Sequence, residues 1–264
     1  MRTARAARAV QLSGACVRAN KERGYPSVEN FWNDLNKLLS DFYKVTVYKG
    51  RWVQYLEGLG MTIALAALAC LIGVCIGVLV ALVKYYAGGK KSFGWKTVNA
   101  ACGIYVTVIR GTPMMVQLLI WSGVIFATSR NFTMVGALGV GVNSGAYVAE
   151  IVRGGLMSVD VGQSEAGRSL GLGYLDTMRF IVIPQAFKNI LPALGNEFIT
   201  LFKDTSLVSA IGGAELIYYA KAVGTKTFDV MYPYIGIACM YLAVVMVLTW
   251  LQGKLERRLR SSER

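Results

Sequence analysis

The chain of 264 residues contains no histidine and few charged residues. Without histidine, serine–histidine and cysteine–histidine catalysis are excluded, and the usual zinc and haem sites lose their commonest ligand. Charged residues make up only 16% of the chain and hydrophobic residues 55%, whereas an average soluble domain has about 25% and about 45–50%. This composition favours a membrane protein over a soluble enzyme.

Two further absences concern nucleotide and metal chemistry. No phosphate-binding loop of the form Gly-x-x-x-x-Gly-Lys-Ser/Thr occurs, so the chain carries no ATP site of that kind. The five cysteines show no metal or redox spacing, and four of them lie in apolar runs as small hydrophobes. We therefore expect no catalytic residue, metal or cofactor on this chain. In a membrane protein, the excess of lysine and arginine behind the net charge of +13 determines which loops face the cytoplasm. We therefore expect no nucleic-acid partner.

Five apolar stretches are long enough to cross a bilayer, which takes about 20 residues per helix. They cover residues 59–83, 98–127, 132–152, 186–211 and 232–251. The second is interrupted from Arg110 to Pro113, and the fourth is the least apolar because it carries Glu197, Lys203 and Asp204. The sequence predicts an all-α membrane protein with five transmembrane helices.

Lysine and arginine in the connecting segments predict the orientation, because they concentrate on the cytoplasmic side. Thirteen lie on one side: Lys84, Lys90, Lys91, Lys96, Arg153, Arg168, Arg179, Lys188, Lys254, Arg257, Arg258, Arg260 and Arg264. The opposite side carries Arg130, Lys221 and Lys226. We expect the N-terminus outside the cell and the C-terminus in the cytoplasm.

The N-terminal segment, residues 1–53, conflicts with this topology because it is basic. It has no apolar core typical of a secretory signal. One interpretation is that residues 1–24 precede the true start residue. Another concerns residues 28–43, which form an amphipathic helix lying along the membrane interface. Residues 54–264 then form the transmembrane domain.

A polar excursion at residues 158–184 separates the third and fourth spans. Ser158 or Asp160 is a suitable N-cap for a short helix, and the run Leu170-Gly171-Leu172-Gly173 ends it. A second helix from Asp176 leads to Pro184, where the chain re-enters the membrane. The excursion therefore has the order helix, glycine turn, helix, and it faces the cytoplasm.

This excursion resembles the EAA loop of permease subunits of bacterial ABC importers. The family pattern is Glu-Ala-Ala, three residues, Gly, nine residues, Ile, one residue, Leu and Pro. Glu165, Ala166, Gly171, Ile181 and Pro184 match it in register, while Gly167 and Ile183 replace the second alanine and the leucine. The resemblance implies that the loop docks on a separate ATP-hydrolysing subunit. The residues it assigns to this coupling are Glu165, Ala166, Gly167, Gly171, Ile181 and Pro184.

Three other segments narrow the resemblance to the polar amino-acid permeases (the His/Glu/Gln/Arg/opine group). They are residues 110–117, 143–155 and 203–207. The resemblance covers about residues 54–260 and implies the type I importer fold in a bacterial inner membrane. The partners it implies are an ATP-binding subunit dimer, a second permease subunit, identical or related, and an extracytoplasmic solute-binding protein. ATP and magnesium would then be bound by the partner.

Polar groups inside the spans are candidates for the substrate pathway, because charges there are costly and usually face a cavity or a partner. The candidates are Arg110, Thr112, Asn143, Asp204 and Thr205. Arg110 either holds a substrate carboxylate at the broken helix or pairs with Glu150, Glu197 or Asp204. Asp204 with Thr205 is suited to attract an amino group. Asn143 either lines the pathway or hydrogen-bonds across helices.

Two other classes of function compete with this interpretation. A secondary amino-acid transporter or channel needs no ATPase, but it predicts an internal repeat that five spans cannot supply. A membrane-embedded enzyme lacks a nucleophile–base pair or a metal cluster. The sequence therefore predicts the permease subunit of an ATP-driven importer for polar or charged amino acids.

Overall fold

The computed structural model describes residues 28–88 and 92–261, and within these ranges the chain is helical, with no strand. Residues 1–24, for which an upstream start is one interpretation, lie outside the described residues. The chain divides into two compact units at the boundary between Trp52 and Val53.

The first unit contains the helix expected over residues 28–43. Helix α2 spans Val28–Phe42 and continues as a π-helical turn, Tyr43–Val47, and a 3-10 turn, Tyr48–Gly50. Phe31, Leu38 and Leu39 are exposed, as expected for an apolar stripe without a protein partner. The structure has a helix at these residues, and the role of residues 1–53 and the location of the helix at the membrane interface stay predictions.

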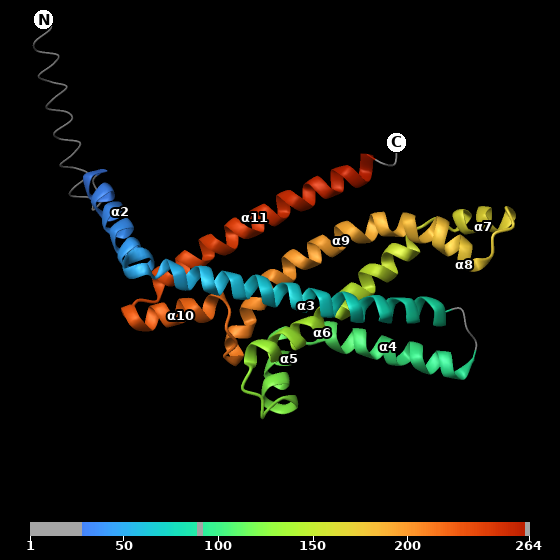
Figure 1. Ribbon diagram of the computed structural model, residues 1–264, viewed down its shortest axis with the longest axis horizontal. Coiled ribbons are helices and arrows are strands. Elements are labelled where there is room, and N and C mark those ends of the chain that lie inside the picture. The colour runs from blue at the N-terminus through green and yellow to red at the C-terminus, as the bar shows by residue number, and fades with distance from the viewer. Residues whose placement is uncertain (1–27, 89–91, 262–264) are drawn as a thin grey trace, which may run out of the picture. The chain divides into compact units, whose positions relative to one another are not determined.

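The second unit contains the long helices (Figure 1). Their order is α3 (Trp52–Ala87), α4 (Phe93–Gly111), α5 (Met114–Ile120), η3 (Trp121–Ile125), α6 (Phe132–Met157), α7 (Val161–Ser169), α8 (Tyr174–Thr177), η4 (Met178–Val182), α9 (Ile183–Asp204), η5 (Thr205–Ile211), α10 (Leu216–Thr227) and α11 (Met231–Ser261). Side chains of Asn131, Asp160 and Glu215 accept hydrogen bonds from the first turns of α6, α7 and α10. These caps satisfy backbone N–H groups that have no partner within the helix.

Three of the described helices, α3, α6 and α11, are long and apolar enough to cross a membrane. A fourth span is reached only if α4 and the α5–η3 helix are taken together across a bend of 108°. Helix α9, the fourth predicted span, does not meet the same criterion, because its charged residues lower its hydropathy. The predicted count of five spans is therefore not confirmed.

The bend between α4 and α5 has a local cause. Pro113 has no N–H, and its ring disfavours the helical conformation at the residue before it. Thr112 accordingly has an extended backbone, with φ −118° and ψ 144°. The break that the sequence predicts between Arg110 and Pro113 is present.

Helix α6 lies at the centre of the second unit, in contact with α4, α5 and α9. It meets α3 through glycines on both helices. A Cβ atom built on Gly77 of α3 would lie 2.5 Å from the Val148 side chain, and one built on Gly141 of α6 would lie 2.8 Å from Ile72. A Cβ atom built on Gly73, four residues before Gly77, would lie 2.9 Å from the Ser144 hydroxyl. The two glycines of α3 therefore make a close contact with α6, the type of packing common between membrane helices.

Because of this contact, we expect glycine-to-alanine substitutions at Gly77 and at Gly60 of α3 to change the unfolding temperature differently. Gly77→Ala overpacks the α3–α6 contact, which typically costs about 1–3 kcal/mol, so we expect thermal unfolding about 2–10 °C lower in detergent. Gly60→Ala is the matched control because nothing lies within 4 Å of its added Cβ, and alanine favours a helix. Equal melting temperatures for the two variants would contradict the close contact.

Candidate functional site

The loop between α6 and α9 has the predicted order of helix, glycine turn and helix. The Asp160 carboxylate accepts a hydrogen bond from the Gly162 N–H at 2.6 Å and begins α7. Helix α7 ends at Ser169, and Gly171 turns the chain with φ +81°, a conformation that favours glycine. Tyr174 then begins an unbroken helical stretch through α8, η4 and α9.

Gly167 holds the two halves of this loop together. It is buried, and a Cβ atom built on it would lie 2.9 Å from Ile181 Cδ1 and 3.1 Å from Thr177. At the glycine that departs from the family pattern, α7 therefore closely approaches the side chains of α8 and η4. Two hydrogen bonds tie the loop to α9: Asn189 donates to Ser158 (2.8 Å) and Gln185 donates to Gln163 (3.2 Å).

The outer surface of the loop combines a carboxylate with apolar side chains. Glu165 and Ala166 are exposed, and the Glu165 side chain makes no ion pair or hydrogen bond with the part of the chain that the structure describes. Leu170 is 81% exposed and Leu175 is 78% exposed. Apolar side chains gathered on an exposed loop are typical of a surface that binds another protein.

Tyr174 of the same loop lines a pocket of about 140 Å³ together with Tyr85 of α3. Partial burial raises the pKa of the Tyr174 hydroxyl, and the nearby Tyr85 and Tyr86 raise it further. The phenol therefore stays neutral at physiological pH. The Tyr85 hydroxyl is also 3.9 Å from the Met178 sulfur, so side chains of the loop contact α3.

A second polar cluster surrounds the break between α4 and α5, and Gln117 is its centre. The Gln117 side chain is 6% exposed. Its amide nitrogen donates to the Ile109 carbonyl and to the Thr112 hydroxyl, both at 2.7 Å, and its oxygen accepts from Asn143 at 2.9 Å. Thr112 and Asn143 are thus joined through a glutamine that sequence reasoning missed, because a single glutamine in an apolar run forms no pattern.

Arg110 lies at the end of α4, beside the break. Its guanidinium carbon is 5.1 Å from the centre of the Tyr147 ring, a cation–π arrangement. It makes no ion pair within residues 28–88 and 92–261. Of the partners expected from the sequence, Glu197 instead accepts a hydrogen bond from Ser144 at 3.0 Å. The Arg110 side chain is exposed and open to a ligand.

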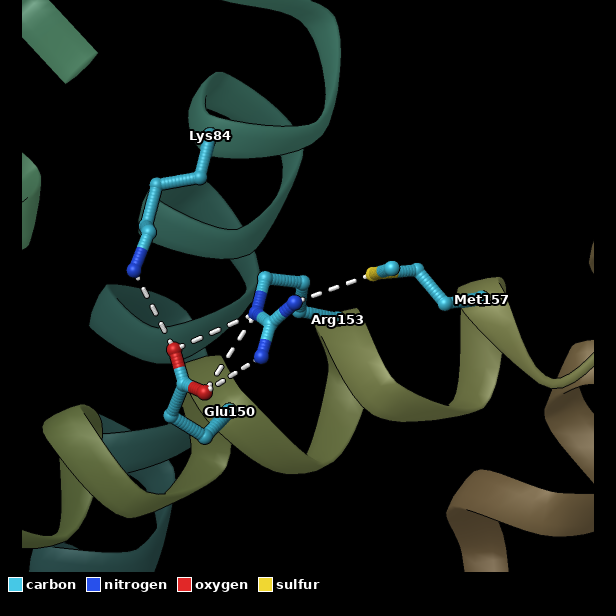
Figure 2. A network of polar contacts seen from close by, with 4 residues as sticks. All are labelled: Lys84, Glu150, Arg153 and Met157. Atoms are coloured by element: carbon cyan, nitrogen blue, oxygen red, sulfur yellow. Dashed lines mark hydrogen bonds and ion pairs between the residues drawn. The ribbon is translucent and has the colours of Figure 1, made fainter. Parts of the chain in front are cut away.

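Glu150, another of the three acidic residues considered as partners of Arg110, forms ion pairs with Lys84 (3.2 Å) and Arg153 (2.8 Å) (Figure 2). Pairing of Arg110 with Glu150, one of the alternatives left open by the sequence, is therefore not present among the described residues. Lys84 comes from α3, so one of these pairs joins two helices. Sequence spacing predicts the pair with Arg153, three residues away on the same helix, but not the pair with Lys84.

Asp204 and Thr205 lie where α9 gives way to η5. Asp204 is half-buried, and Thr205 is completely buried, its hydroxyl donating to the Phe202 carbonyl at 2.7 Å. Thr205 thus has a structural contact in this conformation. Asp204 and Arg110 form no ion pair in the described part of the chain. Substrate contact for both residues at the end of α9 stays a prediction.

The chain combines apolar helices, polar groups at a broken helix, and a loop at residues 158–184 whose two halves pack together. This combination is typical of a membrane permease. Residues 73–261 match the family described as the inner membrane component of binding-protein-dependent transport systems. The chain therefore belongs to this family of transport subunits.

Similar proteins include two named permeases. The putative glutamine transport system permease protein GlnP of Rickettsia bellii (strain RML369-C) is 35% identical over 206 residues, covering 77% of this chain and 91% of the relative. The arginine transport system permease protein ArtQ of Bacillus subtilis (strain 168) is 35% identical over 213 residues, covering 79% and 93%.

Two solved structures share the fold. A crystal structure of an amino acid ABC transporter with histidines aligns with a TM-score of 0.71 at 42% identity, covering 78% of this chain and 94% of the other. An inward-facing structure of the MetNI methionine ABC transporter aligns with a TM-score of 0.68 at 16% identity, covering 81% and 99%. The fold is thus that of ABC importer permeases, as predicted.

Proposed function

We propose that this chain forms the membrane pathway of an ATP-driven importer for polar or charged amino acids. The relatives named for glutamine and arginine transport support this substrate class. The pathway candidates also suit an amino acid, because they include a cation, Arg110, and an anion, Asp204, for the two charged groups that every free amino acid carries. ATP and magnesium bind to a partner, since the chain has no phosphate-binding loop.

The proposal depends mainly on the loop of residues 158–184, whose two halves pack together at Gly167 and which carries the exposed carboxylate of Glu165. An ATP-binding subunit dimer contacts Glu165, Ala166 and the turn at Gly171. Gly167 and Ile181 keep the two halves of the loop together, so that a push on α7 moves α9 with it. Pro184 lies within the continuous helical stretch, two residues after the π-helical turn Met178–Val182 ends, and it has no N–H to donate there.

The pathway begins at the break between α4 and α5. Arg110 binds the substrate carboxylate in a charge-assisted hydrogen bond, and Thr112 and Asn143 form the adjoining polar wall. Asp204 attracts the amino group, with Thr205 supporting the end of α9. A second permease subunit, identical or related, completes the pathway, and an extracytoplasmic solute-binding protein delivers the substrate.

The C-terminus and the loop face the cytoplasm, and the N-terminus faces outside. Supporting this orientation, α7 and α8, the end of α3, the start of α4 and the end of α11 lie toward the same end of the second unit (Figure 1). Among the basic residues counted from the sequence, Lys84, Lys96, Arg168, Lys254, Arg257 and Arg258 belong to these segments. Residues 54–264 form the transmembrane permease domain, and residues 1–53 precede it as a separate segment.

Reconstitution tests this function. Vesicles containing the chain with its ATPase should take up a labelled polar amino acid only under two conditions. ATP must be present on the side of the membrane where the ATPase is bound, and the binding protein must be present on the opposite side. Unlabelled glutamine or arginine should compete, whereas leucine should not. A secondary transporter, the alternative considered from the sequence, would instead move solute without the ATPase, and such uptake would overturn the proposal.

A further inference from the structure

A pocket of about 400 Å³ lies at the ends of α3, α4 and α6, and the proposed pathway does not use it. It is lined by Lys84, Tyr85, Gly88, Asn99, Arg153 and Met157. Asn99 precedes Arg110 by eleven positions on α4, a separation of about 16 Å along the helix. The pocket is therefore distinct from the polar cluster at the broken helix.

The charges around this pocket do not balance. One carboxylate, Glu150, serves two cations: its Oε1 accepts from Lys84 Nζ at 3.2 Å, and its Oε2 accepts from Arg153 Nη2 at 2.8 Å (Figure 2). The group keeps one net positive charge. The Glu150 contact uses only one of the three N–H donors of Lys84. Arg153 donates from Nε and Nη2 to Glu150 and from Nη1 to the Met157 sulfur, which leaves two of its five N–H donors for an anion.

The Asn99 side chain adds a neutral donor at the pocket. It is partly buried, and it makes no hydrogen bond with the residues that the structure describes. The arrangement of two cationic side chains and one amide around a cavity of this size suits a phosphate group, whose oxygens accept several hydrogen bonds at once.

The surroundings of the pocket are apolar and exposed. Phe93 is 85% exposed, and Val98 on α4 and Leu82 on α3 are also exposed. Trp95 packs edge-on against Tyr86, with ring centroids 5.0 Å apart. Tryptophan and tyrosine concentrate at the level of lipid headgroups. A ligand with an anionic head and apolar tails fits this combination of charges and apolar side chains.

We propose that this pocket binds the phosphate-bearing headgroup of an anionic phospholipid, with Lys84, Arg153 and Asn99 contacting the phosphate. Basic pockets between membrane helices are known to hold such headgroups. With the proposed orientation, the lipid belongs to the cytoplasmic leaflet, and this placement rests on the proposed function. The chemistry of the site is the same in either orientation. The site neither contacts the transported substrate nor requires the ATPase.

Native mass spectrometry of the full chain in detergent tests this proposal, using dioleoyl phosphatidylglycerol and dioleoyl phosphatidylcholine as probes. Wild type should retain phosphatidylglycerol in preference to phosphatidylcholine. Lys84→Ala and Arg153→Ala should each weaken that preference about fivefold, since one basic residue near an anionic surface contributes about that factor. Asn99→Leu, which leaves the ion pairs intact, should also weaken it. Lys254→Gln, an equal loss of charge on α11, is the control and should leave the preference unchanged.

Glu150→Gln separates lipid binding from a structural role of the ion pairs. It removes the only carboxylate of the group and adds one net positive charge, so phosphatidylglycerol binding should tighten about fivefold. A loss of binding like that of Lys84→Ala would overturn the proposal, as would equal retention of the two lipids by wild type. Binding of inorganic phosphate without any preference between the lipids would overturn it too, in favour of a site for the free anion. None of these results depends on transport activity, so each leaves the proposed function untouched.

Discussion

Reversing the charge of Glu165 is expected to abolish ATP-driven uptake. The side chain is exposed on α7 and makes no ion pair or hydrogen bond in the described part of the chain. Helix α7 depends instead on its Asp160 cap and the Gly171 turn. Glu165→Lys therefore changes the surface that meets the ATPase and leaves the fold intact. Loss of one partner of a charge pair at an interface costs about 2–5 kcal/mol, so association should weaken at least about 30-fold.

Co-purification of the ATPase and uptake into vesicles are the two measurements for Glu165→Lys. Glu57→Lys provides the matched control, because Glu57 is an exposed carboxylate on α3 outside the loop. We expect this control to retain both activities. If Glu165→Lys retained the ATPase and full uptake, the loop would not be the docking surface. If its melting temperature fell together with both activities, a structural defect would explain the loss.

Removing the Arg110 guanidinium is expected to reduce uptake about 10- to 100-fold while ATPase association stays intact. A hydrogen bond to a charged group contributes about 1.5–3 kcal/mol, and Arg110→Ala removes the group that we propose to hold the substrate carboxylate. The structural cost should be small, because the side chain is exposed and contacts the Tyr147 ring without an ion pair in the part described.

Two further variants make the Arg110 result specific. Arg110→Lys keeps the charge but loses the planar group that presents paired donors to a carboxylate, so it should restore uptake only in part. Arg130→Ala removes an exposed arginine from the segment before α6 and should transport normally. Uptake unchanged in Arg110→Ala would exclude substrate contact, and equal loss of uptake and ATPase association would indicate a structural role.

The loop could be predicted closely from the sequence because its signals are local. A cap at Asp160, a glycine turn at Gly171 and a helix leading to Pro184 each depend on residues a few positions apart. The same holds for the break before Pro113, whose ring acts on its immediate neighbour. The role of Gly167 was not predictable, because it depends on how closely η4 approaches α7.

Contacts between distant segments escaped sequence reasoning. Glu215 is completely buried and joins the start of α10 to α11, since its carboxylate accepts from the Tyr218 N–H at 3.0 Å and from the Tyr241 hydroxyl at 3.1 Å. Neither a lone glutamate after an apolar stretch nor the single Gln117 has a spacing that predicts its partners. Each acquires them only when the helices pack.

Composition, hydropathy and local signals were sufficient to predict a helical membrane protein with a structured loop, because these properties depend on residues near one another along the chain. The permease function followed from the resemblance of that loop to a known family. Tertiary structure decided which polar groups on other helices became the partners of the intramembrane polar groups. Glu150 pairs with Lys84 and Gln117 joins Thr112 to Asn143, since a charged or polar side chain removed from water takes whichever complementary group the neighbouring helix brings within reach.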